Sequence, residues 1–312
     1  MRYLIMGAGA LGSVFGGMLK LAGMQVTLVT KNRPHVEAIR NSGLLISGIW
    51  GDHLIKDIPI YTKPDEIKED FDIILLSVKS HHTEVAMKQL ASLLEKNPYI
   101  VSLQNGLGNM EKIAAFWVPE KTIGARVIFG AALQSPGHTK VTVYADKVLL
   151  GGFCPHVPQK ILTSICNDLN HAHIPTAIVS NIQSYLWGKV LYNCALNPLG
   201  AILNVEYGKL ACDKSTKEIM KEIIKEIFCI AQAKKITLPY SSAEKYFKVL
   251  LENQIPPTAS HRSSMLQDIE AGKITEISSM NGAVVRYGEE LDIPTPYNKM
   301  MTHLICFKHP HT

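Results

Sequence analysis

The stretch "RYLIMGAGALGSVFGGMLKLAG", residues 2–23, decides the fold of the N-terminal half of the chain. It begins as a short apolar strand, passes through closely spaced glycines and ends in the pattern of an apolar helix. Gly7, Gly9 and Gly12 form a G-x-G-x-x-G motif, which is a weak signal alone but here lies between a strand and a helix. Gly7 permits a tight turn, Gly9 lets the backbone approach a pyrophosphate, and Gly12 allows the helix to pack closely on the strand. The stretch therefore predicts a dinucleotide-binding turn.

The start of the helix after the first glycines is the expected place for the diphosphate. Free N–H groups and the helix dipole at an N-terminus favour an anion. We therefore expect the cofactor to contact the motif glycines and the two residues that precede Gly12, Ala10 and Leu11. The alternative is a glycine turn with a purely structural role.

Strand-like and helix-like segments alternate through the N-terminal half. Apolar strand-like runs occupy residues 24–30, 71–80 and 99–109, and residues 83–97 have a helical pattern. Residues 121–153 hold further strand-like pieces that could complete a sheet. Continuous apolar strands indicate burial on both faces. Their alternation with helices predicts an α/β fold with a Rossmann-type, doubly wound parallel sheet.

The turn after the second strand indicates which dinucleotide binds. A site for NAD usually has an acid at this point, which holds the ribose 2′-hydroxyl. This chain instead reads "LVTKNRPH", residues 28–35, and carries Lys31 and Arg33. Cations suit the additional 2′-phosphate of NADP, so we expect NADP(H) as the cofactor. The alternative is a solvated basic turn.

Polar side chains follow the third and fourth strands of the predicted sheet, in Ser77-Val78-Lys79 and Gln104-Asn105-Gly106. In open α/β sheets, ligands gather at the carboxyl ends of the strands. We expect Asn105 to reach the nicotinamide side of the cofactor and Lys79 to meet a phosphate or ribose. For Lys79, a surface lysine without a ligand is nearly as good an explanation.

The second half of the chain is predicted to be helical. Strand patterns stop after residues 174–181, where Pro175 and a candidate N-cap, Asn181, mark the change. Helical patterns follow at residues 182–203, 214–235, 241–252, 259–271, 276–289 and 296–307. We therefore expect two domains: an NADP-binding domain of residues 1–178 and an all-helical substrate-binding and catalytic domain of residues 179–312.

The first of these helices carries a cation and amides in an apolar sequence, "LWGKVLYNCALNPLGAILN", residues 186–204. Burying an unpaired charge is costly, so such groups are normally partnered or functional. Lys189, Asn193 and Asn197 follow one another at intervals of four residues, which places them on one side of a helix. A desolvated lysine has a lowered pKa and can protonate a carbonyl oxygen that becomes an alcohol. A lysine that reaches solvent beside capping asparagines is the alternative.

A second polar region lies in "SHRSSMLQDIEAGKITEISSMNG", residues 260–282. Ser264 lies on a predicted helix that stops near Gly272. Thr275 has the character of an N-cap, which would make Glu276 the first residue of the next helix. The helix dipole would then favour an ionised Glu276, able to orient Lys189 or to accept a hydrogen bond from a substrate hydroxyl. The alternative is an acid that only stabilises its own helix.

Composition limits the classes of function. The formal net charge of +5 comes from scattered basic residues, which fits an anionic ligand weakly and gives no nucleic-acid-binding arm. The six cysteines form no C-x-x-C pair, so we expect reduced thiols in a cytoplasmic protein. We expect no membrane span, because no run of about 18 apolar residues occurs, and no signal peptide. We expect no metal, since His81-His82 and His171-Ala172-His173 lack a third ligand at a known spacing.

Together these segments resemble the ketopantoate reductase (2-dehydropantoate 2-reductase) family of pantothenate and coenzyme A biosynthesis. The matching pieces, from residue 7 to about residue 282, are "GAGALGS", "VKS", "QNGLGN", "WGKVLYNCALNPLGAI" and "SSMLQDIEAGKITEI". The last two are specific and the glycine motif is not. The resemblance implies a Rossmann domain followed by a helical domain, an active site in the cleft between them, and hydride transfer from NADPH to the keto carbon of ketopantoate.

The resemblance also implies roles for individual residues. Lys189 would be the general acid, and Glu276 would bind the substrate hydroxyl and help to fix the lysine. Asn193, Asn197 and Ser264 would hold the substrate, with Ser264 near its carboxylate. Asn105 would order the cofactor and the substrate side of the site, and Lys31 would bind the phosphate.

The chain departs from the family pattern at two positions. It has Ser278 where the family often has an acid, and Tyr207 where some relatives carry asparagine. These departures bear on the identity of the 2-keto acid and not on the reaction type. One alternative is an NADP-dependent reductase of another 2-keto acid, and another is a noncatalytic NADP-binding sensor, which would not need the polar side of the Lys189 helix. The C-terminal helices could form the interface of a homodimer.

Overall fold

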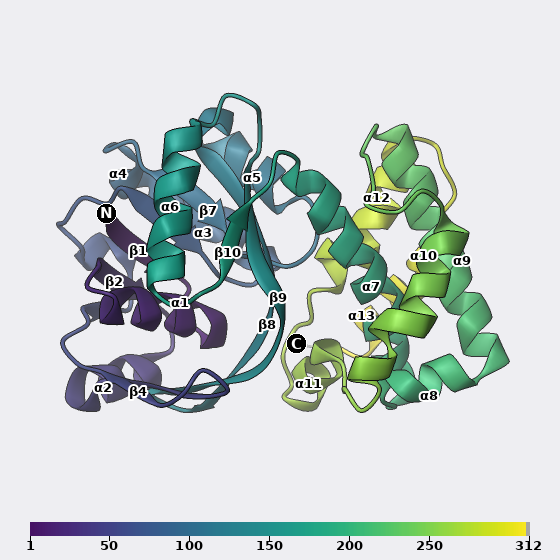
Figure 1. Ribbon diagram of the computed structural model, residues 1–312, viewed down its shortest axis with the longest axis horizontal. Helices are drawn as coiled ribbons and strands as arrows, with labels where there is room; N and C mark the ends of the chain where they lie inside the picture. Colours follow the sequence, from purple (N-terminus) through teal and green to yellow (C-terminus); the bar gives the residue numbers. More distant parts are fainter. Residues whose placement is uncertain (310–312) are drawn as a thin grey trace. The chain divides into compact units, whose positions relative to one another are not determined.

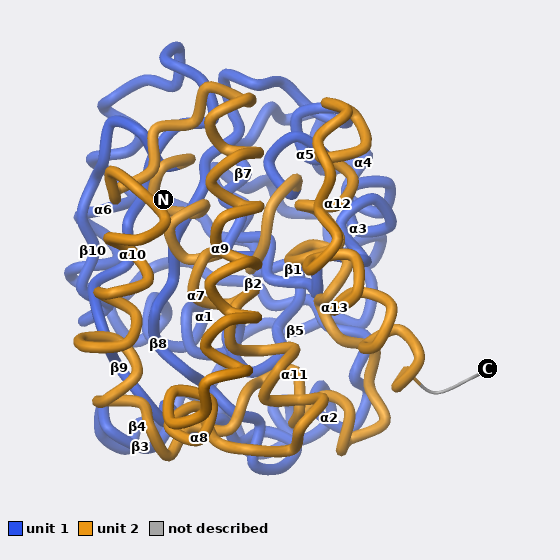
Figure 2. The backbone as a smooth tube through the Cα atoms, turned by 90° about the vertical axis from the view of Figure 1, so that its right-hand side faces the viewer, with its two compact units in different colours: residues 1–104, 109–182 blue, residues 105–108, 183–312 orange. Residues whose placement is uncertain are grey.

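The computed structural model describes residues 1–309, and internal contacts divide the chain into two compact units (Figure 2). Unit 1 comprises Met1–Gln104 and Asn109–Ile182, and unit 2 comprises Asn105–Gly108 and Gln183–Thr312. The main division thus falls after residue 182, whereas the sequence places it after residue 178. The four-residue segment 105–108 joins unit 2 although its neighbours in the sequence belong to unit 1.

Unit 1 is built on one sheet, which contains ten strands in the described part of the chain (Figure 1). The order is β4-β3-β9-β8-β7-β6-β1-β2-β5, and β10 pairs with β9. The strands are β1 (Arg2–Met6), β2 (Gln25–Val29), β3 (Leu44–Gly48), β4 (His53–Ile55), β5 (Ile60–Tyr61), β6 (Ile73–Leu76), β7 (Tyr99–Ser102), β8 (Thr122–Ser135), β9 (His138–Gly152) and β10 (Thr176–Ile178). The predicted strands in the first half are therefore present, and β3, β4 and β5 are additional.

The sheet is mostly parallel, but two of its strand pairs are antiparallel, which the sequence did not predict. β8 and β9 run antiparallel because only two residues separate them, and a connection that short makes a hairpin. The other pair is β3 with β4. The parallel part, β7-β6-β1-β2, carries the predicted cofactor residues at its carboxyl edge.

Helices cover both faces of this sheet, as a doubly wound fold requires. Along β1, Tyr3 and Ile5 belong to one buried cluster, and Leu4 and Met6 belong to another. This alternation follows from the two-residue repeat of a strand. The helices of unit 1 are α1 (Ala10–Leu21), α2 (Arg33–Ser42), α3 (Thr83–Gln89), α4 (Ala91–Leu94), α5 (Asn109–Phe116) and α6 (Gln159–His171), with short 3-10 turns η1 (Pro64–Glu66), η2 (Ser80–His82) and η3 (Pro119–Lys121).

Unit 2 is helical around its own apolar core. Its helices are α7 (Ile182–Leu203), which begins at the last residue of unit 1, α8 (Tyr207–Cys212), α9 (Lys214–Ala233), α10 (Ala243–Val249), α11 (Ser264–Glu270), α12 (Asn281–Glu290) and α13 (Pro296–Phe307). The turns are the π turn η4 (Leu250–Gln254) and the 3-10 turns η5 (Pro256–Thr258) and η6 (Ile277–Ser279). The ranges predicted for α7, α9 and α13 are confirmed within two residues. The helices predicted from residues 259 and 276 begin later, and α8 was not predicted.

A buried carboxylate joins two helices of unit 2. Glu226 on α9 accepts hydrogen bonds from the backbone N–H groups of Tyr297 (2.8 Å) and Asn298 (2.9 Å) and from the side chain of Asn298 (2.7 Å). These N–H groups belong to the first turn of α13, where no partner exists within the helix. Burial raises the pKa of Glu226, against the effect of the three hydrogen bonds. The carboxylate therefore fixes the start of α13 against α9.

Within the described residues, no helix combines the length and the apolar character needed to cross a membrane.

Candidate functional site

In unit 1, the three motif glycines have different surroundings. A Cβ on Gly7, whose φ is +103°, would lie 2.6 Å from the backbone nitrogen of Val78. A Cβ on Gly12 would lie 2.5 Å from the carbonyl oxygen of Gly7. A Cβ on Gly9 would meet nothing within 4 Å in the described chain. Gly7 and Gly12 are thus required by the close packing of the turn, while Gly9 leaves its backbone open to a ligand.

The start of α1 can hold an anion. The helix begins at Ala10, and its N-cap, Gly9, has no side chain that could accept from the first N–H groups. Leu11 and Gly12 complete the first turn of this N-terminus. Beside the turn, the Oγ of Ser77 is buried and has no hydrogen-bond partner among the described residues. Open N–H groups and an unsatisfied hydroxyl fit the polar diphosphate part of a dinucleotide.

The basic residues of unit 1 lie where the strands end. Lys31 follows β2 and is exposed, and its Nζ lies 3.3 Å from Nε2 of His82 in η2. Burial and the Lys31 charge lower the pKa of His82, so its neutral ring accepts a hydrogen bond from the ammonium. Lys79, half-buried, occupies the N-cap position of η2. The sequence did not predict this contact, because the two residues lie far apart in the chain.

In unit 2, three predicted site residues form one cluster, the Lys189–Asn105–Glu276 cluster. The Nζ of Lys189, on α7, donates to the Oδ1 of Asn105 at 2.5 Å. The Nδ2 of Asn105 donates to Oε2 of Glu276 at 3.4 Å. Lys189 is half-buried, and Glu276 is only 8% exposed. A lysine, an amide and a carboxylate from three distant parts of the sequence are therefore hydrogen-bonded in series.

The chemistry of the two outer groups fixes the orientation of the amide. An ammonium can only donate hydrogen bonds, and an ionised carboxylate can only accept them. Asn105 must therefore turn its oxygen to Lys189 and its nitrogen to Glu276. This arrangement holds a proton donor in a defined position, as acid catalysis at a carbonyl oxygen requires.

The backbone of residues 105–108 explains how Asn105 reaches this place. The N–H of Leu107 donates to the carbonyl of Ser279 at 2.7 Å, and Leu107 is buried in the core of unit 2. Gly106 has a φ of +87°, and a Cβ there would collide with the same carbonyl oxygen. Glycine at position 106 is therefore needed both for the backbone conformation and for the close approach.

The prediction that Glu276 begins a helix behind a Thr275 N-cap is wrong. Glu276 is itself the N-cap residue of the three-residue turn η6, and α12 begins only at Asn281. The hydroxyl of Thr275 accepts from the N–H of Ile277 at 3.3 Å and contacts His309 at 2.8 Å. So short a turn has little dipole, and the Glu276 side chain accepts a hydrogen bond from Asn105 instead.

The two asparagines that follow Lys189 on α7 are both buried, Asn193 at 9% and Asn197 at 4% exposure. The Oδ1 of Asn197 accepts a hydrogen bond from the hydroxyl of Tyr207, and its Nδ2 lies 3.8 Å from the sulfur of Met280. The sequence singled out Tyr207 as unusual but did not predict this contact. The tyrosine hydroxyl, buried with the rest of its ring at 2% exposure, fixes the Asn197 amide.

The last predicted site residue, Ser264, is exposed at the first position of α11. Its neighbour Ser263 is the N-cap and accepts from the N–H of Leu266 at 3.0 Å. Ser278, the other unusual position, is exposed, and its carbonyl accepts from Arg286 at 2.7 Å. No described contact links Ser264 to the Lys189–Asn105–Glu276 cluster.

The chain is similar to known proteins along almost its whole length. The family model "Ketopantoate reductase PanE/ApbA" matches residues 3–153, and "Ketopantoate reductase PanE/ApbA C terminal" matches residues 181–309. The 2-dehydropantoate 2-reductase of Aquifex aeolicus is 38% identical over 99% of this chain and 97% of its own length. The protein of the same name from Pyrococcus abyssi is 34% identical over 98% and 97%.

Solved structures show the same architecture. A ketopantoate reductase of the PanE/ApbA family from Ralstonia eutropha is 28% identical, with a TM-score of 0.89, over 99% of this chain and 98% of that one. A D-mandelate dehydrogenase, solved with NADH and anilino(oxo)acetate, is 27% identical with the same TM-score and coverage. With both of its halves matched by the family models and full-length relatives above 30% identity, the chain belongs to the ketopantoate reductase family.

Proposed function

We propose that this protein reduces 2-dehydropantoate to pantoate with NADPH, a step of pantothenate and coenzyme A biosynthesis. Support comes from membership of the family and from full-length relatives named 2-dehydropantoate 2-reductase. The observation that carries the proposal is the hydrogen-bonded Lys189–Asn105–Glu276 cluster. A reductase of this kind needs a hydride, which the bound nicotinamide supplies, and a proton, which the protein must supply.

In this proposal Lys189 is the general acid. Its ammonium donates a proton to the keto oxygen as that oxygen becomes a hydroxyl, and its charge stabilises the developing alkoxide. Asn105 keeps the ammonium in place through its amide oxygen. Glu276 holds the Asn105 amide and accepts a hydrogen bond from the substrate hydroxyl. Asn193, Asn197 and Ser264 hold the rest of the substrate, with Ser264 near its carboxylate.

Reductases of this family use a nicotinamide dinucleotide, and we propose that this chain uses NADP(H). In this proposal the cofactor contacts the glycine turn with Ala10 and Leu11, Lys79 at the edge of the sheet, and Lys31 at its 2′-phosphate. Asn105 and Glu276 also contact the cofactor. The turn after β2 contains Lys31 and leads to Arg33 at the start of α2, and it has no acid. Replacing Lys31 by alanine should raise the Kd of NADPH about tenfold to hundredfold, since it removes a charge-assisted hydrogen bond. The Kd of NADH should not change, and an equal loss for both would contradict the assignment.

We further propose that the N-terminal domain, predicted for residues 1–178 and ending at residue 182 as a compact unit, binds NADP. The helical domain, predicted for residues 179–312, binds the substrate and is catalytic. Substrate and cofactor are the small-molecule partners of the protein. The homodimer and the cytoplasmic location remain predictions.

The substrate is tested by a panel of 2-keto acids with NADPH and NADH, followed by the loss of reduced-nicotinamide absorbance. The highest kcat/KM should belong to 2-dehydropantoate with NADPH.

A second candidate is reduction of another 2-keto acid, which is favoured by the likeness to D-mandelate dehydrogenase and by the Tyr207–Asn197 contact. A bulkier or aromatic keto acid as the best substrate would support that candidate. NADPH binding without turnover of any keto acid in the panel would instead support a noncatalytic NADP-binding sensor.

Lys189→Ala tests the mechanism. Loss of a general acid should lower kcat by about 10²- to 10⁴-fold and leave the Kd of NADPH almost unchanged. Lys245→Ala, at an exposed lysine of α10, is the matched control and should behave as the wild type. Lys189→Arg keeps the charge without an acid of suitable pKa, so it should restore little of the activity. Equal loss of turnover and of NADPH binding in Lys189→Ala would refute the role.

A further inference from the structure

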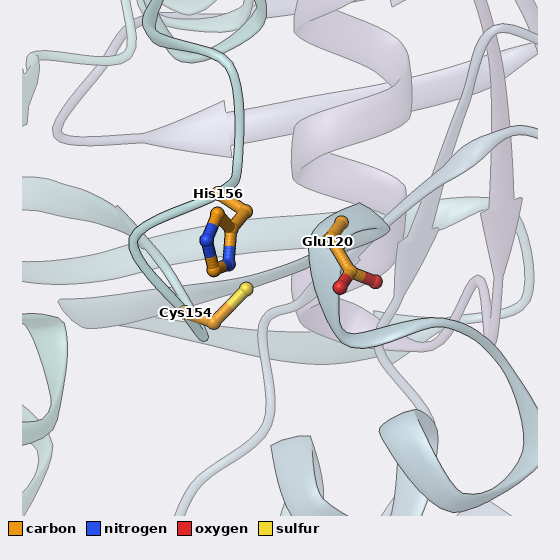
Figure 3. Close-up of side chains that lie close together, drawn as sticks. All are labelled: Glu120, Cys154 and His156. Carbon is orange, nitrogen blue, oxygen red and sulfur yellow. The ribbon is translucent and has the colours of Figure 1, made fainter.

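Three side chains of unit 1 have the composition of a transition-metal site. Glu120, Cys154 and His156 each offer one ligand atom, and these atoms lie within 4.8 Å of one another. Figure 3 shows the Cys154 sulfur beside the His156 ring, with the Glu120 carboxylate coming from a separate segment. None of the three belongs to the candidate functional site, so the proposed reductase activity does not account for the cluster.

Backbone hydrogen bonds tie together the two segments that carry these residues. Glu120 lies in η3, which leads directly into β8, and the partner strand β9 ends just before Cys154. In the β8–β9 ladder Ile123 pairs with Gly152, and the N–H of Phe153 donates to the carbonyl of Thr122 at 2.9 Å. This bond extends the pairing of the two strands by one residue beyond the end of β9. Glu120 and Cys154 therefore emerge side by side from the open end of one hairpin.

Each segment is also fixed on its own. After Cys154 the chain turns back, the N–H of Val157 lies 3.4 Å from the Cys154 carbonyl, and the Val157 side chain is buried at 6% exposure. This turn places His156 next to Cys154. On the other segment, Lys121 donates to the carbonyl of Asn97 at 2.5 Å. The backbone positions of the three ligand residues are therefore set by the fold without an ion, which favours metal binding.

The donor set selects the metal. A thiolate, an imidazole and a carboxylate are the protein ligands of Zn²⁺, whereas Mg²⁺ and Ca²⁺ take oxygen ligands. Zinc bound at about 2.0–2.3 Å holds its donors roughly 3.3–3.8 Å apart in a tetrahedron. The ligand atoms lie up to 4.8 Å apart, so they would have to approach one another by about 1 Å to bind zinc. Side-chain rotation can provide this movement, because Glu120 and His156 are exposed.

We propose that Glu120, Cys154 and His156 form a Zn²⁺ site with three protein ligands and one water, which clips η3 to the loop between β9 and α6. Binding releases the thiol proton to solvent and forms a Zn–S bond. Because the ion binds only the folded arrangement, it stabilises unit 1. The expectation of no metal rested on the pairs His81-His82 and His171-Ala172-His173 and did not include these three residues. Glu120 is far from Cys154 and His156 in the chain, and the β8–β9 hairpin brings them together.

The test uses the full-length, untagged protein after chelator treatment. Calorimetric titration with Zn²⁺ should give one saturable site per chain, and Zn²⁺ should raise the melting temperature. Co²⁺ in place of Zn²⁺ should give the near-ultraviolet absorption of a thiolate-to-cobalt charge transfer. Cys154→Ser should abolish that absorption, and His156→Gln and Glu120→Gln should each weaken Zn²⁺ binding about tenfold or more.

Two variants serve as controls. Cys212→Ser, at an exposed cysteine of unit 2, and His171→Gln, at an exposed histidine of α6, should bind Zn²⁺ as the wild type does. Unchanged NADPH binding by Cys154→Ser would show that this variant folds. The proposal fails if no saturable Zn²⁺ binding is found, if bound Co²⁺ shows no sulfur band, or if Cys212→Ser removes the band instead.

Discussion

Gly9 and Gly12 show how two residues of one motif differ in what they do. Gly12 packs against the Gly7 carbonyl, while Gly9 has open space around it and a φ of −84° that other residues adopt. Gly12→Ala should lower the free energy of unfolding by about 1–3 kcal/mol, because the added methyl group forces the turn apart. Gly9→Ala should change it by less than about 0.5 kcal/mol, yet weaken NADPH binding, since the methyl group stands where the pyrophosphate approaches.

Denaturant unfolding and NADPH titration of the two variants measure both effects, and each variant is the control for the other. Similar losses of stability in Gly9→Ala and Gly12→Ala would mean that the surroundings of the two glycines do not differ as described.

At the scale of elements, His35 joins three parts of unit 1. It lies on α2 and is fully buried, its Nδ1 accepts from the N–H of Gly137 at 2.9 Å, and its Nε2 lies 3.1 Å from the Oγ of Ser13 on α1. Gly137 belongs to the turn between β8 and β9. Because Nδ1 accepts a hydrogen bond, the folded protein needs the neutral ring, with its proton on Nε2.

This contact predicts a loss of stability in acid. Burial lowers the pKa of His35 from its ordinary value of 6.5, so below pH 6.5 the unfolded chain binds a proton that the folded chain does not. The contribution of His35 to the free energy of unfolding is therefore fully present above pH 6.5. It falls as the pH drops from there toward the pKa of the folded state, by at most about 1.4 kcal/mol per pH unit.

Urea unfolding between about pH 7.5 and about pH 5 measures this slope. His35→Gln should be less stable near neutrality but should lose less stability on acidification. Other histidines with a lowered pKa, His82, His261 and His309, contribute to both proteins, so the difference between them isolates His35. Parallel pH profiles for wild type and His35→Gln would contradict the prediction.

At the scale of the molecule, unit 2 is completed by four residues from the middle of unit 1's sequence. Leu107, 4% exposed, contributes to the core of unit 2, and Asn105 contributes to its polar cluster. A fragment of residues 183–312 lacks both. We expect it to be less stable than unit 2 in the full chain by about 2–5 kcal/mol, the usual effect of removing a buried leucine.

Thermal unfolding of the fragment and of full-length Leu107→Ala, followed by circular dichroism, checks this expectation. Leu107→Ala should lose a similar amount of stability in unit 2 and keep NADPH binding at the glycine turn. A fragment as stable as unit 2 in the intact chain would show that residues 105–108 are dispensable for its fold.

The sequence by itself determined the architecture and the identity of the candidate residues. Strand, glycine and helix patterns are local, because they depend on backbone preferences and on a repeat of two or 3.6 residues. The pattern therefore predicted β1, β2, β6 and β7 and the long helices α7, α9 and α13. It also singled out Lys189, Asn105 and Glu276 as candidate site residues.

Only the tertiary structure decided how those residues meet. The antiparallel β8–β9 pair, the short turn at Glu276 and the Asn105 bridge between lysine and carboxylate depend on contacts between distant segments. Local patterns carry no information on such contacts. The free energy of these contacts comes from packing and hydrogen bonds that form only when distant segments come together during folding. The same holds for Glu120, Cys154 and His156, which one hairpin brings together.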